Sequence, residues 1–212
     1  MNIQILSQST AATEINGDFV LHEELAGGSL VLLADGMGGL SFPDQAAKVV
    51  CEAIREYFEN NKMPNPVDLI RQSLEYADGV LSRLCYQRKC KMGTALTLMF
   101  ITNQQLYYTS QGDVRLYHKG IDGTITQLTT DDVVRMENEC YLTTCINGKG
   151  FRNPINVQSV PVEIGDNFLL CSDGFYRNYS INDYLKNKAL LHIQQTEDDC
   201  TLIKVTVINQ SE

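Results

Sequence analysis

Two apolar runs in this sequence end in an aspartate that is followed at once by a glycine. Residues 31–40 read VLLADGMGGL and place Asp35 at the end of such a run, and residues 168–174 read FLLCSDG and place Asp173 in the same position. Asp-Gly is a common turn dipeptide, so a turn explains one such ending. Two of them in one chain suggest carboxylates that are gathered at a site.

Further carboxylates stand at the ends of expected strands. Asp18 precedes the run FVLHEE, and Asp113 stands at a glycine-marked bend in SQGDVRLY. Asp198 and Asp199 come immediately before TLIKVTVI, with only Cys200 between. Because the end of one antiparallel strand lies beside the start of the next, these acids could share one rim of a sheet.

Carboxylates crowded in this way repel one another, and their pKa values rise. A hard divalent cation relieves the repulsion, and Mg²⁺ and Mn²⁺ favour oxygen ligands. The simpler alternative is that every Asp-Gly pair is only a turn in an acidic, β-rich binding module. A turn is the better explanation of any single pair, but for the full ordered set we favour the metal site.

The elements that must hold these acids follow from the spacing of apolar residues. Helical spacing predicts two helices, over residues 44–60 and 66–87. A further short helix is expected within residues 180–191, SINDYLKNKALL. The remaining strand-like runs are a hairpin of FVLHEE and SLVLLA, then TALTLMFIT, QLYYTSQ, VRLYHKG, GTITQLT, NVQSVPVEI, NFLLCS and TLIKVTVI. Antiparallel strands with segregated helices predict an α+β fold, which we take as one domain over residues 1–212.

Composition limits the class of protein. Of the 212 residues, 43% are hydrophobic and 20% are charged, and the formal net charge of −9 argues against a nucleic-acid partner. No apolar run reaches the length of a membrane span, and the N-terminus lacks the features of a signal peptide. We therefore expect a cytoplasmic protein with no membrane partner, whose seven cysteines are reduced thiols.

Six short motifs occur in an order typical of one known family. The sequence resembles the metal-dependent (type 2C, PPM) Ser/Thr protein phosphatases of the bacterial type. The matching pieces are ADGMGG at 34–39, MGTALT at 92–97, GDVRLY at 112–117, QLTTDD at 127–132, LLCSDGF at 169–175 and DDCTLIKV at 198–205. The resemblance implies a β-sandwich of two antiparallel sheets flanked by helices, a four-layer αββα arrangement. It also implies hydrolysis of phosphoserine or phosphothreonine in a phosphorylated protein by water that bridges two Mg²⁺ or Mn²⁺ ions.

The same resemblance assigns roles to the acids. Asp35 would bridge both metal ions, and the carbonyl of Gly36 would bind one of them. Asp173 and Asp198 would hold the other. Asp18 would act near the second metal, directly or through water.

The sequence departs from the family pattern at several positions. Asp113 matches an acid associated with a third, weaker metal, but Arg177 stands where some relatives carry a further acid for that metal. Thr13 replaces an Arg that binds the substrate phosphate, Gly17 replaces a Glu or Gln, and Met37 replaces a His. One explanation is membership of the sporulation and stress-response branch, which also lacks the Arg. The other is a weakened or inactive relative that acts by binding a regulatory partner; we favour activity because the core aspartates are all present.

The segment after residue 132 is short, which predicts a reduced flap and an open site. Lys149 and Arg152, in NGKGFRN, would reach an incoming phosphate only if this loop borders the site, and a surface role is favoured. For Arg115 a structural salt bridge is the favoured role. We further expect a monomer that acts together with a cognate Ser/Thr kinase.

Overall fold

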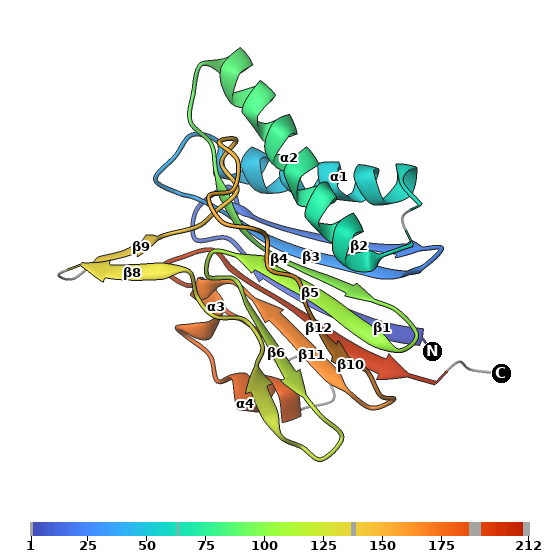
Figure 1. Ribbon diagram of the computed structural model, residues 1–212. Helices are drawn as coiled ribbons and strands as arrows, with labels where there is room; N and C mark the ends of the chain where they lie inside the picture. The colour runs from blue at the N-terminus through green and yellow to red at the C-terminus, as the bar shows by residue number, and fades with distance from the viewer. Residues whose placement is uncertain (1, 63, 137–138, 187–191, 210–212) are drawn as a thin grey trace.

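The predicted antiparallel strands form two five-stranded sheets that pack face to face (Figure 1). This computed structural model describes residues 2–62, 64–136, 139–186 and 192–209. The first sheet has the order β1 (Asn2–Thr10), β12 (Cys200–Ile208), β11 (Asn167–Cys171), β6 (Arg115–Lys119) and β7 (Ile125–Gln127). The second has the order β10 (Gln158–Pro161), β5 (Gln105–Gln111), β4 (Thr94–Ile101), β3 (Gly28–Gly36) and β2 (Asp18–Leu25).

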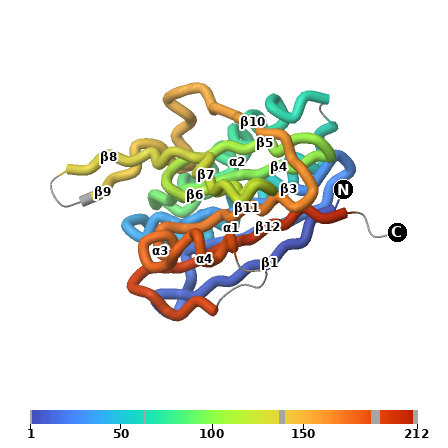
Figure 2. The backbone as a smooth tube through the Cα atoms, turned by 90° about the horizontal axis from the view of Figure 1, so that it is seen from below, coloured from blue at the N-terminus to red at the C-terminus, as the bar shows by residue number. Residues whose placement is uncertain are grey.

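Helices cover the outer face of each sheet, so the predicted four layers are confirmed. Helices α1 (Pro43–Asn60) and α2 (Pro66–Arg88) lie over the second sheet. On the far side, α3 (Asp173–Tyr176) and α4 (Ile181–Lys186) lie against the first sheet, as the view from below shows (Figure 2). This second helical layer is much the smaller, because its two helices have only 4 and 6 residues.

The unbroken apolar run before Asp35 reflects burial on both faces of β3. Leu30 and Leu32 pack among the residues beneath α1 and α2, whereas Val31 and Leu33 pack between the two sheets. A strand in the middle of the four layers has no solvent-facing side, so the usual alternation of apolar and polar residues is absent.

One strand goes beyond the sequence-based expectations, and two other features agree with them. Strand β1 was not predicted; its residues alternate between exposed and half-buried positions, which gives a weak apolar signal. The reduced flap is a hairpin of β8 (Val133–Met136) and β9 (Glu139–Leu142) that projects from the body of the molecule (Figure 1). The short helix expected over 180–191 is found as α4, and its residues 187–191 lie outside the described part of the chain.

All seven cysteines lie in the described part of the chain and are free thiols, as predicted. Among the described helices, none is both long and apolar enough to span a membrane.

Candidate functional site

Two of the predicted site residues face each other across neighbouring strands. Antiparallel pairing of β2 with β3 places Asp18 opposite Asp35, and the next pairing of β3 with β4 places Gly36 opposite Thr94. The Thr94 hydroxyl donates a hydrogen bond of 2.7 Å to the backbone carbonyl of Asp35. The register of the second sheet therefore fixes both carboxylates at the same end of the sandwich.

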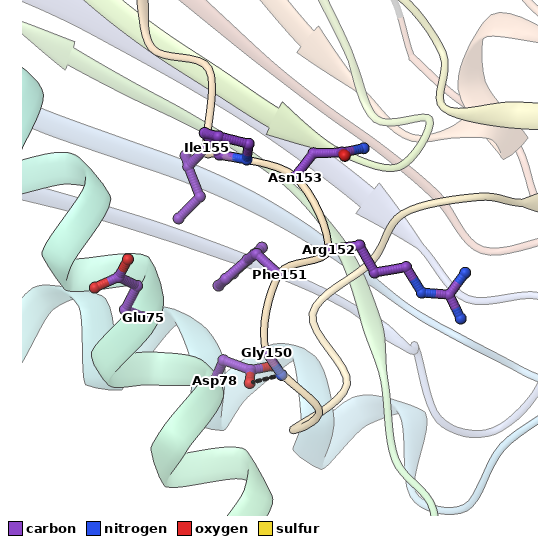
Figure 3. A pocket seen from close by; sticks show the side chains of 8 residues that line it. Glu75, Asp78, Gly150, Phe151, Arg152, Asn153 and Ile155 are labelled. Carbon is purple, nitrogen blue, oxygen red and sulfur yellow. Dashed lines mark hydrogen bonds between the residues drawn. The ribbon is translucent and has the colours of Figure 1, made fainter.

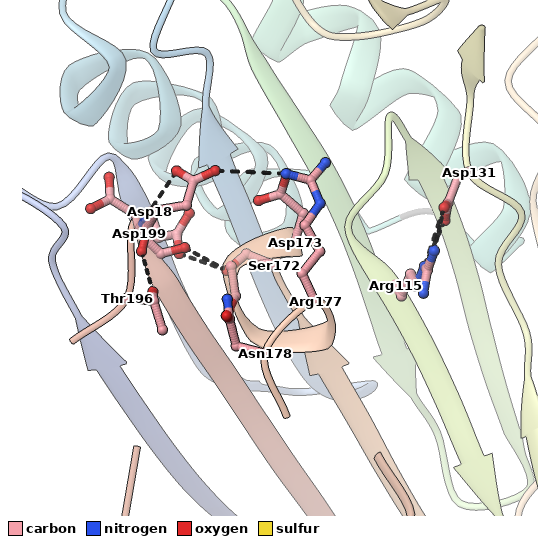
Figure 4. Close-up of polar contacts among 11 residues, drawn as sticks. Asp18, Arg115, Asp131, Ser172, Asp173, Arg177, Asn178, Thr196 and Asp199 are labelled. Carbon is pink, nitrogen blue, oxygen red and sulfur yellow. Dashed lines mark hydrogen bonds and ion pairs between the residues drawn. The ribbon is translucent and has the colours of Figure 1, made fainter. Parts of the chain in front are cut away.

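The first sheet brings a third acid to this end. Strand β11 stops at Cys171, and α3 begins two residues later at Asp173. The intervening Ser172 is fully buried and donates its hydroxyl to Asp18 Oδ2 at 2.8 Å (Figure 4). This hydrogen bond joins acids from the two sheets. The other oxygen of Asp18, Oδ1, is buried and has no hydrogen-bond partner among the described residues.

The pKa values of these carboxylates are raised mainly by burial and further by their acidic neighbours. Burial, together with the charges of Asp199 and Asp173, raises the pKa of Asp18 to about 7. Burial also raises the pKa of Asp35 well above its ordinary value, and the charges of its acidic neighbours add to the effect. For Asp173 burial is again the main cause, and its pKa rises to about 6 even though Arg177 opposes the change. A bound cation would stabilise the ionised form of these carboxylates.

Arg177 supplies one positive charge at the edge of the cluster. Its Nη1 lies 2.8 Å from Asp173 Oδ2 and 3.9 Å from Asp198 Oδ2. Figure 4 shows the side chain reaching from the last turn of α3 towards these acids. Burial raises the pKa of Asp113, and the nearby Arg177 partly offsets this rise. Asp113 therefore shares its surroundings with a guanidinium group.

The two acids that precede β12 have different roles. The carboxylate of Asp199 points to the N-terminal loop and accepts hydrogen bonds from the backbone N–H groups of Ala12 at 2.8 Å and Gly17 at 2.6 Å. Asp198 is exposed and lies near Arg177. Asp198 Oδ1 accepts the backbone N–H of Asp199 at 2.9 Å, whereas the side chain of Asp199 holds the loop in place.

The glycines after the two strand-end aspartates are required by packing. A Cβ on Gly36 would lie 2.2 Å from the carbonyl oxygen of Pro43, and a Cβ on Gly174 would lie 2.2 Å from that of Asp199. Gly17 is also confined, because its Cβ would lie 3.1 Å from Asp199 Oδ2. A side chain at position 17 would therefore require the Asp199 carboxylate to give way slightly.

The donor set fits a divalent metal ion in its chemistry. Its side chains offer carboxylate oxygens, one of which is buried without a partner, and such ligands suit Mg²⁺ and Mn²⁺. Within the described residues, however, no three acidic, His or Cys side chains already stand in a metal-binding arrangement.

Sequence reasoning anticipated one contact and missed others around the site. The expected salt bridge of Arg115 is confirmed: its Nη2 lies 2.7 Å from Asp131 Oδ2, and its guanidinium carbon lies 3.6 Å from the centre of the Tyr176 ring. Exposed Thr13 donates to the carbonyl of Ile15, so no cation takes the place of the missing Arg at that position. The links from Ser172 to Asp18 and from Asp199 to the loop had no sequence signal beyond the residue types.

A match to a family model identifies the family of this chain. The family model described as protein phosphatase 2C matches residues 9–200. No curated protein sequence matches the chain.

Solved structures show the same fold at low sequence identity. The catalytic domain of the serine/threonine protein phosphatase PstP, in complex with two manganese ions, is 22% identical, with 98% of this chain and 99% of that chain covered and a TM-score of 0.76. PppA, a regulatory component of the type VI secretion system of Pseudomonas aeruginosa, is 22% identical, with coverage of 97% and 98% and a TM-score of 0.78. Serine/threonine phosphatase Stp1 from Staphylococcus aureus is 18% identical, with coverage of 98% and 95% and a TM-score of 0.80.

Proposed function

This chain belongs to the protein phosphatase 2C family and is a phosphoprotein phosphatase, and on that premise we propose that it hydrolyses phosphoserine and phosphothreonine with two divalent metal ions. The observation that carries the two-metal proposal is the crowding of Asp18, Asp35 and Asp173 at one end of the sandwich, with a buried carboxylate oxygen of Asp18 left unpaired. Like-charged groups held together in this way are stabilised by a bound cation. The manganese pair of the PstP structure supports the choice of Mn²⁺ or Mg²⁺.

The proposed ligands divide between the two sheets. Asp35 at the end of β3 would bridge the two ions, and the carbonyl of Gly36 would bind one of them. Asp173 and Asp198 of the first sheet would hold the other ion, and Asp18 would support it directly or through water. The proposed site therefore forms only when the two sheets pack with these ends side by side.

When bound, the two ions would lower the pKa of the water they share and neutralise the phosphoryl oxygens. The protein's own residues orient these ligands. Ser172 fixes one oxygen of Asp18, and Thr94 fixes the backbone at Asp35. Asp199 keeps the loop that leads into Asp18 against the site. Hydrolysis by metal-activated water needs no covalent enzyme intermediate.

Two finer assignments belong to the same proposal. Asp113 would take part in a third, weaker metal site, beside Arg177. The whole of residues 1–212 would act as one phosphatase domain, a cytoplasmic monomer that reverses the work of a cognate Ser/Thr kinase. Assignment to the sporulation and stress-response branch stays a prediction.

Hydrolysis of an aryl phosphate tests the proposal directly. We expect turnover with Mn²⁺, none with EDTA, and a loss of about a thousandfold or more in Asp173→Asn, because that change removes a metal ligand. The control is Asp122→Asn, which alters a carboxylate on an exposed turn. Turnover that persists in Asp173→Asn would contradict the proposed ligand set. No turnover with any divalent ion, in a folded protein, would instead favour a phosphatase-like binding protein.

A further inference from the structure

A groove with a volume of about 970 Å³ lies beside the end of β5. One wall is formed by the last residues of that strand, Thr109, Ser110 and Gln111. The opposite wall is formed by the segment 142–158, which leads from the flap to β10. The groove is therefore bounded by strand backbone on one side and by a loop on the other.

The loop wall is held firmly by helix α2. The buried carboxylate of Asp78 accepts three backbone hydrogen bonds, from Asn147 at 3.2 Å, Gly148 at 2.7 Å and Gly150 at 2.7 Å. Both glycines have φ of +75°, a backbone conformation that favours glycine. Figure 3 shows the loop on Asp78, with Arg152 extending away from α2. These hydrogen bonds hold the loop wall in one conformation.

The end of β5 extends beyond the part of that strand that pairs with β10. Strand β10 pairs with β5 only from Gln105 to Tyr108. In the part of the chain that the structure describes, residues 109–111 have a partner strand on the β4 side and none on the β10 side. Thr109 is buried, and Ser110 and Gln111 are half-buried, so the open part of this edge lies at its last two residues. A strand edge without a partner strand can pair with an added extended segment through main-chain hydrogen bonds.

The charge of the groove differs from that of the whole protein. Three ionisable side chains of the Asp, Glu, Lys and Arg types line it, namely Asp132, Lys149 and Arg152. Asp132 is engaged, because Gly112 N–H and the Thr144 hydroxyl both donate to its Oδ2. The two basic side chains are exposed. The lining therefore carries two exposed basic groups and one carboxylate, in a chain whose formal net charge is −9, and Lys149 and Arg152 complement an acidic ligand.

The groove also leads to the candidate metal site. Gln111 lines the groove, and the chain turns at Gly112 directly into Asp113. An extended segment paired with residues 109–111 would therefore bring a neighbouring phosphorylated side chain towards the acids.

We propose that this groove binds an extended, acidic segment of the phosphoprotein substrate, which pairs as an added strand with residues 109–111 and places its acidic side chains against Lys149 and Arg152. This inference rests on the proposed phosphatase function and deepens it, since it names the class of sequence that the site accepts. The short flap leaves recognition to this groove.

The test compares two phosphothreonine peptides, one with acidic flanking residues and one with neutral flanks, in the presence of Mn²⁺. The wild type should prefer the acidic peptide in kcat/KM. In the double variant Lys149→Glu/Arg152→Glu that preference should fall by roughly tenfold, mainly through KM. The matched control, Lys62→Glu/Lys186→Glu, makes the same charge change at two exposed positions outside the groove and should keep the preference. Equal losses in both double variants would overturn the proposal.

A second arm separates strand pairing from charge. Methylation of alternate backbone amides in the acidic peptide should weaken its binding, measured by fluorescence anisotropy, and an unchanged affinity would overturn the added strand. The binding measurement does not depend on turnover. Binding that depends on Lys149 and Arg152, without aryl phosphate hydrolysis, would contradict the proposed phosphatase function and support the proposed groove. Aryl phosphate hydrolysis with no preference for the acidic peptide would support the phosphatase function and contradict the proposed groove.

Discussion

The two Asp-Gly strand ends look alike in sequence but differ in their surroundings. At both, the glycine is forced by a carbonyl oxygen that would lie 2.2 Å from an added Cβ. The charged groups that act on Asp35 are all acids, whereas Asp173 has Arg177 within 2.8 Å. One end therefore has only acids among its strongest charged neighbours, and the other is already partly neutralised. The glycine is shared because both strand ends are tightly packed, whereas the difference in charge affects how each aspartate would bind a cation.

Alanine at either glycine would test the shared part of the comparison and should have the largest effect on stability. We expect Gly36→Ala and Gly174→Ala each to lower the free energy of unfolding by about 2 kcal/mol, because the methyl group meets backbone that cannot move cheaply. Urea unfolding measures the loss. Gly38→Ala is the control, since a Cβ there meets nothing within 4 Å. Equal stability of all three variants would show that the close approaches do not constrain the fold.

Removing Arg177 would test the difference between the two ends. In Arg177→Ala we expect Mn²⁺ to bind roughly fivefold more tightly, because a half-exposed cation that competes for Asp173 is gone; an exposed pair of this kind contributes about 1 kcal/mol. Isothermal titration calorimetry gives the affinity, and Arg177→Lys should stay near the wild type. Weaker Mn²⁺ binding in the alanine variant would mean that Arg177 supports the metal site.

The smallest expected effect is the pH dependence of the free energy of unfolding in EDTA. It tests the environment of Asp18, which lies opposite Asp35. Burial raises the pKa of Asp18 from its ordinary value of 3.8 to about 7, so between these values the folded state keeps a proton that the unfolded chain has lost. The stabilisation is complete below the lower value and is lost as pH rises through the higher one. Stability should therefore decline between about pH 4 and pH 7, and the decline should be shallower in Asp18→Asn. Parallel curves for the two proteins would refute the assignment.

Much of the fold was predictable because its signals are local. Periodic apolar residues marked α1 and α2, and short β-rich runs bounded by Gly, Asn and Asp marked most strands. Strand β1 escaped prediction because it lies at a sheet edge, where its partner is β12 and its side chains are only partly buried. The 4 residues of α3 are too few to show a period.

The site was predictable as a set of strand ends but not as a network. Antiparallel topology explains why Asp18 and Asp35 meet, and their register confirms that reasoning. The hydrogen bond from Ser172 to Asp18 spans 154 positions along the chain, and no local pattern encodes it. The same holds for Asp78, whose contact with the 147–150 backbone depends on how α2 packs.

The pairing of β1 with β12 has a consequence for engineering. Asn2 lies opposite Ile208 at the far end of the sandwich; β1 runs from there towards the end that carries the acids, and β12 runs back from that end (Figure 1). A short linker can therefore join residues 2 and 208 without crossing the site, and the chain can be reopened at the Ala26–Gly27 turn, which lies at the same far end. A circular permutant of this design would keep every strand pairing that positions the carboxylates, so catalysis would be separable from the order in which the strands are joined.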